Sequence, residues 1–83
     1  MKVTVRYFAS IREAIGQGSE AVETSATTLG ALRDELIARG GAHASSLARG
    51  RAVRMALNQT LSDESATLVE GAEVAFFPPV TGG

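Results

Sequence analysis

The sequence contains no cysteine, and it has one histidine, His43, among its 83 residues. The absence of cysteine excludes disulfides, thiolate metal sites and cysteine nucleophiles together. A solitary histidine has too few potential partners to form a metal site, so we expect His43 to be a surface residue. The chain therefore holds no recognisable metal centre or catalytic constellation of its own.

Neither an excess of charge nor a long apolar run is present. Eight Lys and Arg residues stand against nine Asp and Glu, a net charge of −1. Without a basic excess to neutralise phosphates, nucleic acid is a disfavoured partner. No apolar run approaches the roughly 20 residues that span a bilayer, and the N-terminus alternates instead of forming a signal-peptide core. We expect a cytoplasmic protein that does not bind membranes, with room for one domain.

The first segment, 2–8, alternates between apolar and polar residues. This period predicts a half-buried strand in which Val3, Val5 and Tyr7 face inward. Phe8 is out of phase with these three residues. Its ring is therefore expected on the polar face of the strand.

Two short elements are predicted next. Range 9–16 reads as a short helix with Ile11 and Ile15 on one side, and a glycine, Gly16 or Gly18, ends it. Range 19–24 is a weak strand with few apolar residues. We expect that strand at an edge of the sheet.

The main helix is predicted from Leu29 to about Arg39, with Thr28 as its N-cap and glycines 40–41 as its end. One apolar stripe has the spacing of a helix face: Leu29, Leu32, Leu36 and Ile37. The polar residues of the same helix are expected to face solvent: Arg33, Asp34, Glu35 and Arg39. Glu35 and Arg39 are four apart and should form an ion pair. Gly30 is an unusual choice in a first helical turn.

Range 42–51 is small and polar and carries no motif. Arg49, Arg51 and Arg54 form a sparse basic cluster close to it. The simplest interpretation of this cluster is a solvated face, and docking of an acidic partner is the weaker alternative.

Strand patterns return in the second half of the chain. Range 52–58 alternates, and Asn58 with Gln59 predicts a hairpin turn toward 60–61. Range 73–77 ends in four consecutive apolar residues, as expected for a central strand covered on both faces. Leu68 and Val69 are expected to close against the core.

The order of elements predicts an α+β fold: a mixed sheet with one main helix packed on one face, for which a β-grasp topology fits well. If the first and last strands pair at the sheet centre, Phe8 and Phe77 share the uncovered face. Exposed apolar patches of that kind usually mark a partner-binding surface. The alternative is that a loop covers both rings.

The last residues predict an exposed tail. Pro78 and Pro79 cannot continue a strand, so range 1–77 is expected to be the domain and 78–83 a flexible, extended tail. Gly82 and Gly83 leave a terminal carboxylate without side-chain shielding. As an anion it resists attack, but an ATP-using partner could convert it to an acyl adenylate, and a sulfur donor would then produce a thiocarboxylate. An inert, frayed end is the alternative.

Three segments, 7–13, 56–61 and 73–83, together resemble the small, sulfur-carrier subunit of molybdopterin synthase, the MoaD family. The resemblance implies a ubiquitin-like β-grasp domain whose end is adenylated by an E1-like adenylyltransferase and sulfurated by a sulfurtransferase. The thiocarboxylate then donates sulfur to cyclic pyranopterin monophosphate in molybdenum cofactor biosynthesis. The resemblance also implies that the chain binds no cofactor, because the activating partner uses the ATP. It further implies that the large synthase subunit is a partner, in a heterotetramer of two small and two large subunits.

The same resemblance assigns residues. Gly83 would bear the adenylate and then the sulfur, on the tail formed by Pro78, Pro79, Val80, Thr81 and Gly82. The implied partner-binding residues are Phe8, Arg12, Leu61 and Phe77. Catalytic groups are expected in the large subunit, so this chain would not be an enzyme alone. A thiamine-type sulfur carrier, a ubiquitin-like protein modifier and a non-covalent interaction domain are alternative functions.

Overall fold

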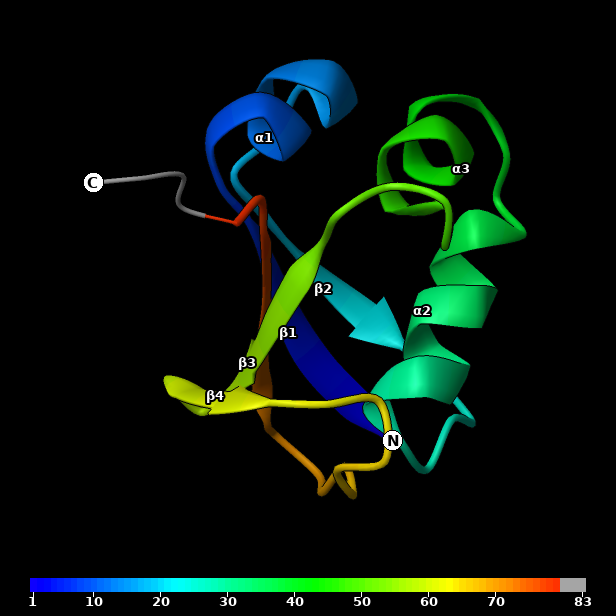
Figure 1. The fold of residues 1–83 in the computed structure, drawn as a ribbon. Coiled ribbons are helices and arrows are strands. Elements are labelled where there is room, and N and C mark those ends of the chain that lie inside the picture. The colour runs from blue at the N-terminus through cyan, green and yellow to red at the C-terminus, as the bar shows by residue number, and fades with distance from the viewer. Residues whose placement is uncertain (80–83) are drawn as a thin grey trace.

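The computed structural model describes residues 1–79; the predictions for Val80, Thr81, Gly82 and Gly83 lie outside this range. Eight elements form the domain (Figure 1): β1 Lys2–Tyr7, α1 Ala9–Ile15, β2 Ser19–Glu23, α2 Leu29–Ile37, α3 Gly41–Leu47, β3 Arg54–Leu57, β4 Thr60–Ser62 and β5 Glu73–Phe77. They make one five-stranded sheet with the order β2-β1-β5-β3-β4. β1 and β5 are parallel, and the other three pairs are antiparallel.

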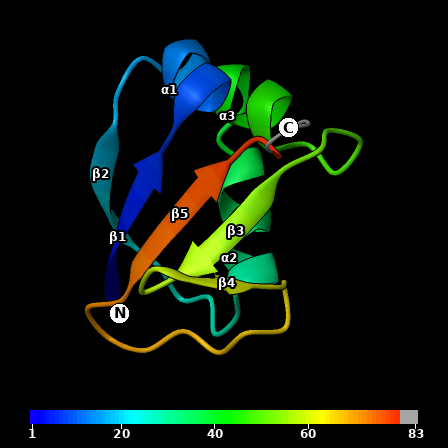
Figure 2. The same ribbon diagram turned by 60° about the vertical axis from the view of Figure 1, so that its left-hand side comes forward.

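This topology confirms the predicted ubiquitin-like β-grasp fold. Figure 2 shows β5 at the centre of the sheet between β1 and β3, with α2 behind the sheet. β2 is an edge strand, and β3 and β4 form the predicted hairpin. Its two turn residues, Asn58 and Gln59, both have positive φ. A two-residue turn of this kind matches the right-handed twist of paired strands.

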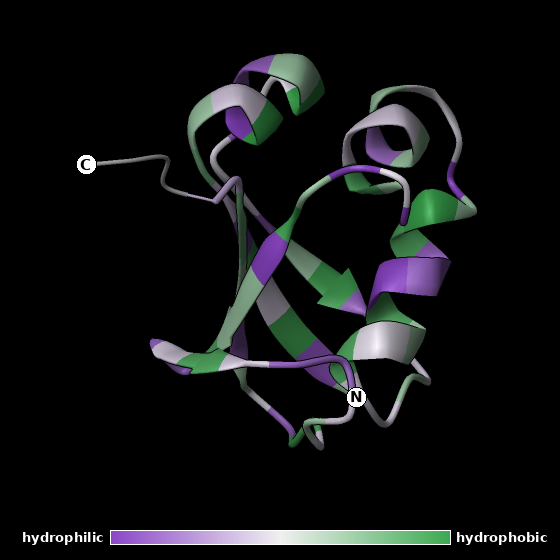
Figure 3. Cartoon of the chain, viewed as in Figure 1, coloured by the Kyte–Doolittle hydropathy of each residue, from purple (hydrophilic) through white to green (hydrophobic). Residues whose placement is uncertain are grey.

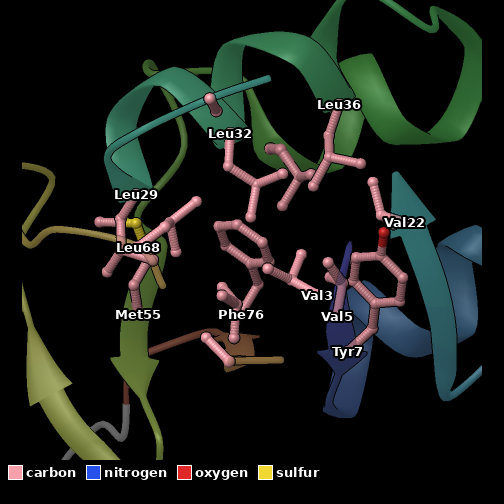
Figure 4. Packing of buried hydrophobic residues seen from close by; sticks show 14 of the residues in the cluster. Val3, Val5, Tyr7, Val22, Leu29, Leu32, Leu36, Met55, Leu68 and Phe76 are labelled. Atoms are coloured by element: carbon pink, nitrogen blue, oxygen red, sulfur yellow. The ribbon is translucent and has the colours of Figure 1, made fainter. Parts of the chain in front are cut away.

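The core lies between the sheet and the helices (Figure 4). Val3, Val5 and Tyr7 are at most 1% exposed, as the alternation of β1 predicts. Their partners include Phe76 from β5, whose ring stacks on Tyr7 with centroids 6.3 Å apart. α1 ends at Gly16 in the left-handed conformation and buries Ile11. Leu68 is buried, but Val69 is 55% exposed and so does not close against the core as predicted.

α2 has the predicted start and an earlier end. The Thr28 hydroxyl accepts a hydrogen bond from the Ala31 amide, which is an N-cap. The helix ends at Ile37, two residues before Arg39. Hydrophobic and hydrophilic bands alternate along it in Figure 3. The prediction that Arg33 faces solvent is wrong, because this residue is 4% exposed.

The predicted ion pair between Glu35 and Arg39 is also wrong. The Glu35 carboxylate accepts hydrogen bonds from the Thr24 and Ser25 hydroxyls. The Arg39 guanidinium donates to Glu20 of β2 at 2.8 Å. Glu35 therefore links α2 to the residues after β2, and Arg39, just after α2, pairs with β2 itself; these tertiary partners outcompete a weak pair along the helix.

The unassigned range 42–51 is largely a third helix, α3, whose Leu47 is completely buried. Arg49 is exposed, as the predicted solvated face requires, but acidic side chains pair with its charge. Its guanidinium donates to Asp34, to Glu64 at 2.6 Å and to the Gly30 carbonyl at 3.2 Å. All three arginines of the sparse basic cluster are thus exposed, and Arg49 in addition links α2 to the loop after β4.

Gly30 has a packing reason in this structure. Its amide donates to the Glu64 carbonyl at 2.9 Å, which brings the loop after β4 against the first turn of α2. A Cβ at Gly30 would lie 3.0 Å from the Glu64 Cβ and 3.2 Å from the Glu64 carbonyl oxygen. Only glycine allows this approach without displacement of the loop.

Candidate functional site

The candidate site is the sheet face opposite α2, which no helix covers among residues 1–79 (Figure 2). Strand register places one row of residues across it: Arg6 on β1 opposite Ala75 on β5, and Ala56 on β3 opposite both Ala75 and Leu61 on β4. The two central positions are alanines. The middle of the face is therefore low, with larger side chains around it. β5 is the central strand, as predicted, and Ala75 on this side is only 8% exposed, although no helix of residues 1–79 covers it.

Large apolar side chains stand around the alanines. Phe8 is 37% and Leu61 is 63% exposed, although both are apolar. Phe77 is half-buried and lies opposite Arg54 in the sheet register. The predicted sharing of the uncovered face by Phe8 and Phe77 is thus confirmed, and no loop of the described chain buries them. Leu61, at the edge of the same face, extends the apolar area.

A hollow lies over Ala75, and its wall includes Phe8, Phe77, Pro78 and Pro79. Arg6 forms its polar rim. The Arg6 guanidinium lies 5.1 Å from the centroid of the Phe8 ring and pairs with Glu73 at 3.6 Å. A cation in this position interacts with the ring face and holds the ring in place. The hollow can accept an apolar side chain of a partner.

A second hollow begins on the other side of Pro79, where it is lined by Met55, Arg54 and Leu61. Pro79 therefore lies between two concave surfaces. β5 leads directly from the apolar face into this position (Figure 1). The structure brings Phe8, Phe77 and the two prolines together, with Leu61 on the adjoining slope.

Arg12 is the predicted partner-binding residue that the structure does not bring to these hollows. It is exposed on α1, and its guanidinium lies against Gly18, where a Cβ would meet the Arg12 Nε at 3.2 Å. The side chain thus points toward the loop before β2. A role in docking stays a prediction for Arg12.

A polar cluster lies on the opposite, helix-covered side of the sheet. Glu20 of β2 accepts hydrogen bonds from Tyr7 at 2.7 Å and from Arg39, and its Oε2 lies 3.0 Å from His43 Nε2. His43 is only 17% exposed, so its prediction as a surface residue is wrong. The ring packs edge-on against Tyr7, with centroids 5.8 Å apart. Sequence spacing gave no signal for this cluster, because its members come from three elements and the connection between α2 and α3.

The electrostatics of this cluster are those of a structural ion network. Partial burial by itself raises the pKa of Glu20, but hydrogen bonds from Arg39, His43 and Tyr7 outweigh it and lower the pKa to about 2. Burial, reinforced by the Glu20 hydrogen bond, raises the pKa of the Tyr7 hydroxyl above its ordinary range. The carboxylate therefore stays ionised and the phenol neutral near pH 7. Neither group is poised to exchange protons there.

The described part of the chain holds no group of three His, Asp or Glu residues that could bind a metal ion. None of the helices within residues 1–79 is long and apolar enough to cross a membrane. The open face itself offers apolar side chains, the ion pair of Arg6 with Glu73, and the exit of the chain after β5. This combination suits protein docking.

Comparisons with known proteins match this chain over nearly its whole length. The model of the ThiS family matches residues 5–83. The molybdopterin synthase sulfur carrier subunit of Escherichia coli (strain K12) is 41% identical over 81 residues, which are 98% of this chain and 99% of that protein. The match therefore includes most of the tail as well as the domain.

Two solved structures show the same arrangement of elements. The crystal structure of SAMP1 from Haloferax volcanii has a TM-score of 0.79 over all of both chains at 24% identity, a likeness in fold. A chain in the complex of subunits 1 and 2 of the molybdopterin-converting factor from Helicobacter pylori is 28% identical. It has a TM-score of 0.71 over the full length of both chains.

Proposed function

The chain belongs to the ThiS family and, within it, to the molybdopterin synthase sulfur carrier subunits, and from this premise we propose that Gly83 is the group that carries the sulfur. Its carboxylate is adenylated by an E1-like partner that uses ATP. Sulfur at the oxidation level of sulfide, supplied through a sulfurtransferase, then attacks the carbonyl carbon: a C–S bond forms, and AMP leaves with the electron pair of the broken C–O bond. The resulting thiocarboxylate donates its sulfur to cyclic pyranopterin monophosphate in the large synthase subunit.

One observation supports this proposal above the others. The central strand β5 runs from the apolar open face straight into Pro78 and Pro79, four residues before Gly83. Docking of that face would hold the carrier while the tail enters a partner's active site. The reaction then becomes effectively intramolecular, which raises the local concentration of the reacting group.

The open face suits the large subunit as its partner. Phe8 and Phe77 present apolar area in the wall of the hollow over Ala75, and Leu61 lines the adjoining hollow. The related Helicobacter pylori protein was solved in complex with its subunit 2. Catalytic acids and bases for the sulfur transfer would come from the partner, so the chain acts as a carrier within a larger enzyme.

Mass spectrometry tests the role of Gly83. The full chain is incubated with ATP, an E1-like enzyme and a sulfur source. We expect a mass gain equal to the exchange of one oxygen for one sulfur, located on Gly83 by fragmentation. Attachment of the chain to other proteins would instead indicate a protein modifier. No change in mass would contradict the proposal.

The partner determines which cofactor receives the sulfur. The charged chain is mixed with the large synthase subunit and cyclic pyranopterin monophosphate, and molybdopterin is measured. We expect formation of the dithiolene product together with recovery of the free carboxylate. Sulfur delivery to a thiamine precursor but not to the pterin would indicate the thiamine-type carrier instead.

The Phe77→Asp variant tests docking. Burial of a charge in an apolar contact should weaken binding to the large subunit by about 30-fold or more, a loss typical of a central interface residue. Val69→Asp is the matched control, because Val69 is also an exposed apolar residue but lies in the loop before β5, away from the hollow. Equal affinities of both variants and the unchanged chain would contradict docking through this face.

A further inference from the structure

Each of the three hollows around Pro78 and Pro79 is lined by one arginine. Arg54 lines the hollow that Pro79 shares with Leu61, Arg6 lines the hollow over Ala75, and Arg51 lines a small hollow beside Pro78. Arg54 is also directly opposite Phe77 in the sheet. The cations nearest to the start of the tail are thus guanidinium groups.

The only lysine of the sequence, Lys2, lies at the other end of the sheet. The Lys2 carbonyl accepts a hydrogen bond from the Gly71 amide at 2.8 Å, so Lys2 lies beside Gly71. Gly71 is six residues before Phe77, along the direction of β5. At about 3.3 Å per residue, this separation is roughly 20 Å. In Figure 1 the N-terminus lies at the bottom, whereas β5 ends at the top.

The N-terminal amine of Met1 is at that distant end as well. It donates a hydrogen bond to the Thr24 carbonyl at 2.9 Å and pairs with Glu23 at 3.2 Å. Both primary amines of the chain are therefore remote from Pro79, and the terminal one is held by two contacts.

Chain length defines which groups an activated terminus could reach. The four residues after Pro79 span at most about 14 Å. Cross-strand neighbours lie about 5 Å apart, so the region around Arg54 and Phe77 is well within that distance. Lys2 would be met only if the tail and the lysine side chain were both fully stretched back along the sheet.

The distinction between arginine and lysine is chemical at this place. A neutral lysine amine attacks an acyl adenylate at its carbonyl carbon: a C–N bond forms, the C–O bond to phosphate breaks, and AMP leaves. The amine proton passes to solvent. A guanidinium remains protonated and offers no such nucleophile. Although only about one lysine in a thousand is neutral near pH 7.4, tethering raises its effective concentration greatly.

We propose that arginine, in place of lysine, at positions 6, 51 and 54 protects the activated terminus from self-acylation. This inference rests on the proposed activation of Gly83. It predicts that lysine at these positions would divert activated chains into a dead-end internal amide before sulfur is added.

The test uses the full chain with a thioester at the Gly83 carboxyl as a stable, defined electrophile, so no activating enzyme is required. We expect Arg54→Lys and Arg51→Lys to yield a product that lacks one water relative to the free acid, at least tenfold faster than the unchanged chain. Fragmentation should locate an amide between Gly83 and the introduced side chain.

Two controls make the result specific. Arg54→Gln removes the charge without adding an amine, and Arg39→Lys adds an amine just after α2, where the residue pairs with Glu20 of the edge strand β2. In both controls the thioester should only hydrolyse, at the rate of the unchanged chain. Circular dichroism verifies the fold of every variant. Hydrolysis alone in both Arg54→Lys and Arg51→Lys would overturn the inference and leave the proposed activation of Gly83 untouched.

Discussion

Arg33 joins three parts of the chain that are distant in sequence. Its side chain is 5% exposed. It donates to the carbonyls of Leu47 at 2.7 Å and Ala48 at 3.1 Å, and to Glu64 at 3.2 Å. The end of α3 and the loop after β4 are thus held against α2 by one guanidinium. A buried charge is tolerated here because its donors meet carbonyl and carboxylate acceptors.

Removal of this group should be costly. We expect Arg33→Met to lower the free energy of unfolding by about 2–4 kcal/mol, because two carbonyls and a carboxylate lose a buried donor. Arg51→Met is the matched control, since Arg51 is exposed, and should change stability by less than about 0.5 kcal/mol. Urea unfolding measures both. Equal midpoints would show that Arg33 has no such role.

Glu20 gives a residue-scale prediction about pH. Its pKa of about 2 in the folded protein is below the ordinary value of 4.5. A depressed carboxyl pKa contributes stability that is complete above the unfolded pKa and is lost as the pH falls through the folded one. We expect stability to decline between about pH 4.5 and 2, by roughly 1–3 kcal/mol from this group.

The Glu20→Gln variant tests that assignment. It should be less stable than the unchanged chain at pH 7 and show a flatter loss of stability between pH 4.5 and 2. Thermal unfolding across this range provides the comparison. Parallel curves for the two proteins would attribute the acid sensitivity to other carboxylates.

At the scale of elements, α2 depends on the loop between β4 and β5 for its position. The Gly30 amide bonds to the Glu64 carbonyl, and Glu64 in turn accepts hydrogen bonds from Arg33 and Arg49. The Glu64 side chain is partly exposed, so its ion pairs with Arg33 and Arg49 each contribute modestly to stability. The close backbone approach at Gly30 is the feature that a substitution can test.

Gly30→Ala has two opposing effects. Alanine gains about 1 kcal/mol of helix propensity, whereas its Cβ would lie 3.0 Å from the Glu64 Cβ. Overpacking typically costs 1–3 kcal/mol, and we expect a net loss of about 1 kcal/mol. Gly50→Ala is the control, because a Cβ there meets nothing within 4 Å. Stabilisation by Gly30→Ala in chemical denaturation would contradict the packing argument.

At the scale of the whole molecule, the domain separates stability from chemistry. The core residues lie between Val3 and Phe76 in the sequence. They fill the space between one face of the sheet and the helices. The other face and the tail exit carry the groups proposed for docking and transfer. Changes at the end of the chain should therefore affect the reaction and leave the fold intact.

Deletion of Gly83 tests this separation. We expect the shortened chain to unfold at the same denaturant midpoint as the full chain, because the core lies within the described residues. Sulfur loading in the mass-spectrometric assay should be lost. Normal adenylation of the shortened chain, or a large fall in stability, would each contradict the separation.

The sequence by itself determined most of the elements, although not α3 or the end of α2, and it placed Phe8 and Phe77 on an open face. Apolar and polar residues alternate over 2–8, and an apolar stripe with helical spacing begins at Leu29, after the N-cap Thr28. Backbone geometry imposes such local periods on any half-buried strand or helix. Phe8 was visible as out of phase for the same reason. The tail residues Pro78 to Gly83 were recognisable because proline and glycine restrict or free the backbone directly.

Only the tertiary structure decided which polar groups meet. Arg33 and Arg39 lie on the polar side of a helical pattern, yet one is buried by carbonyls of α3 and the other pairs with β2. The same applies to His43 beside Tyr7 and to the arginines around Pro79. Such contacts join residues far apart in the chain, and no local period records them, because their energies arise from partners that folding brings together.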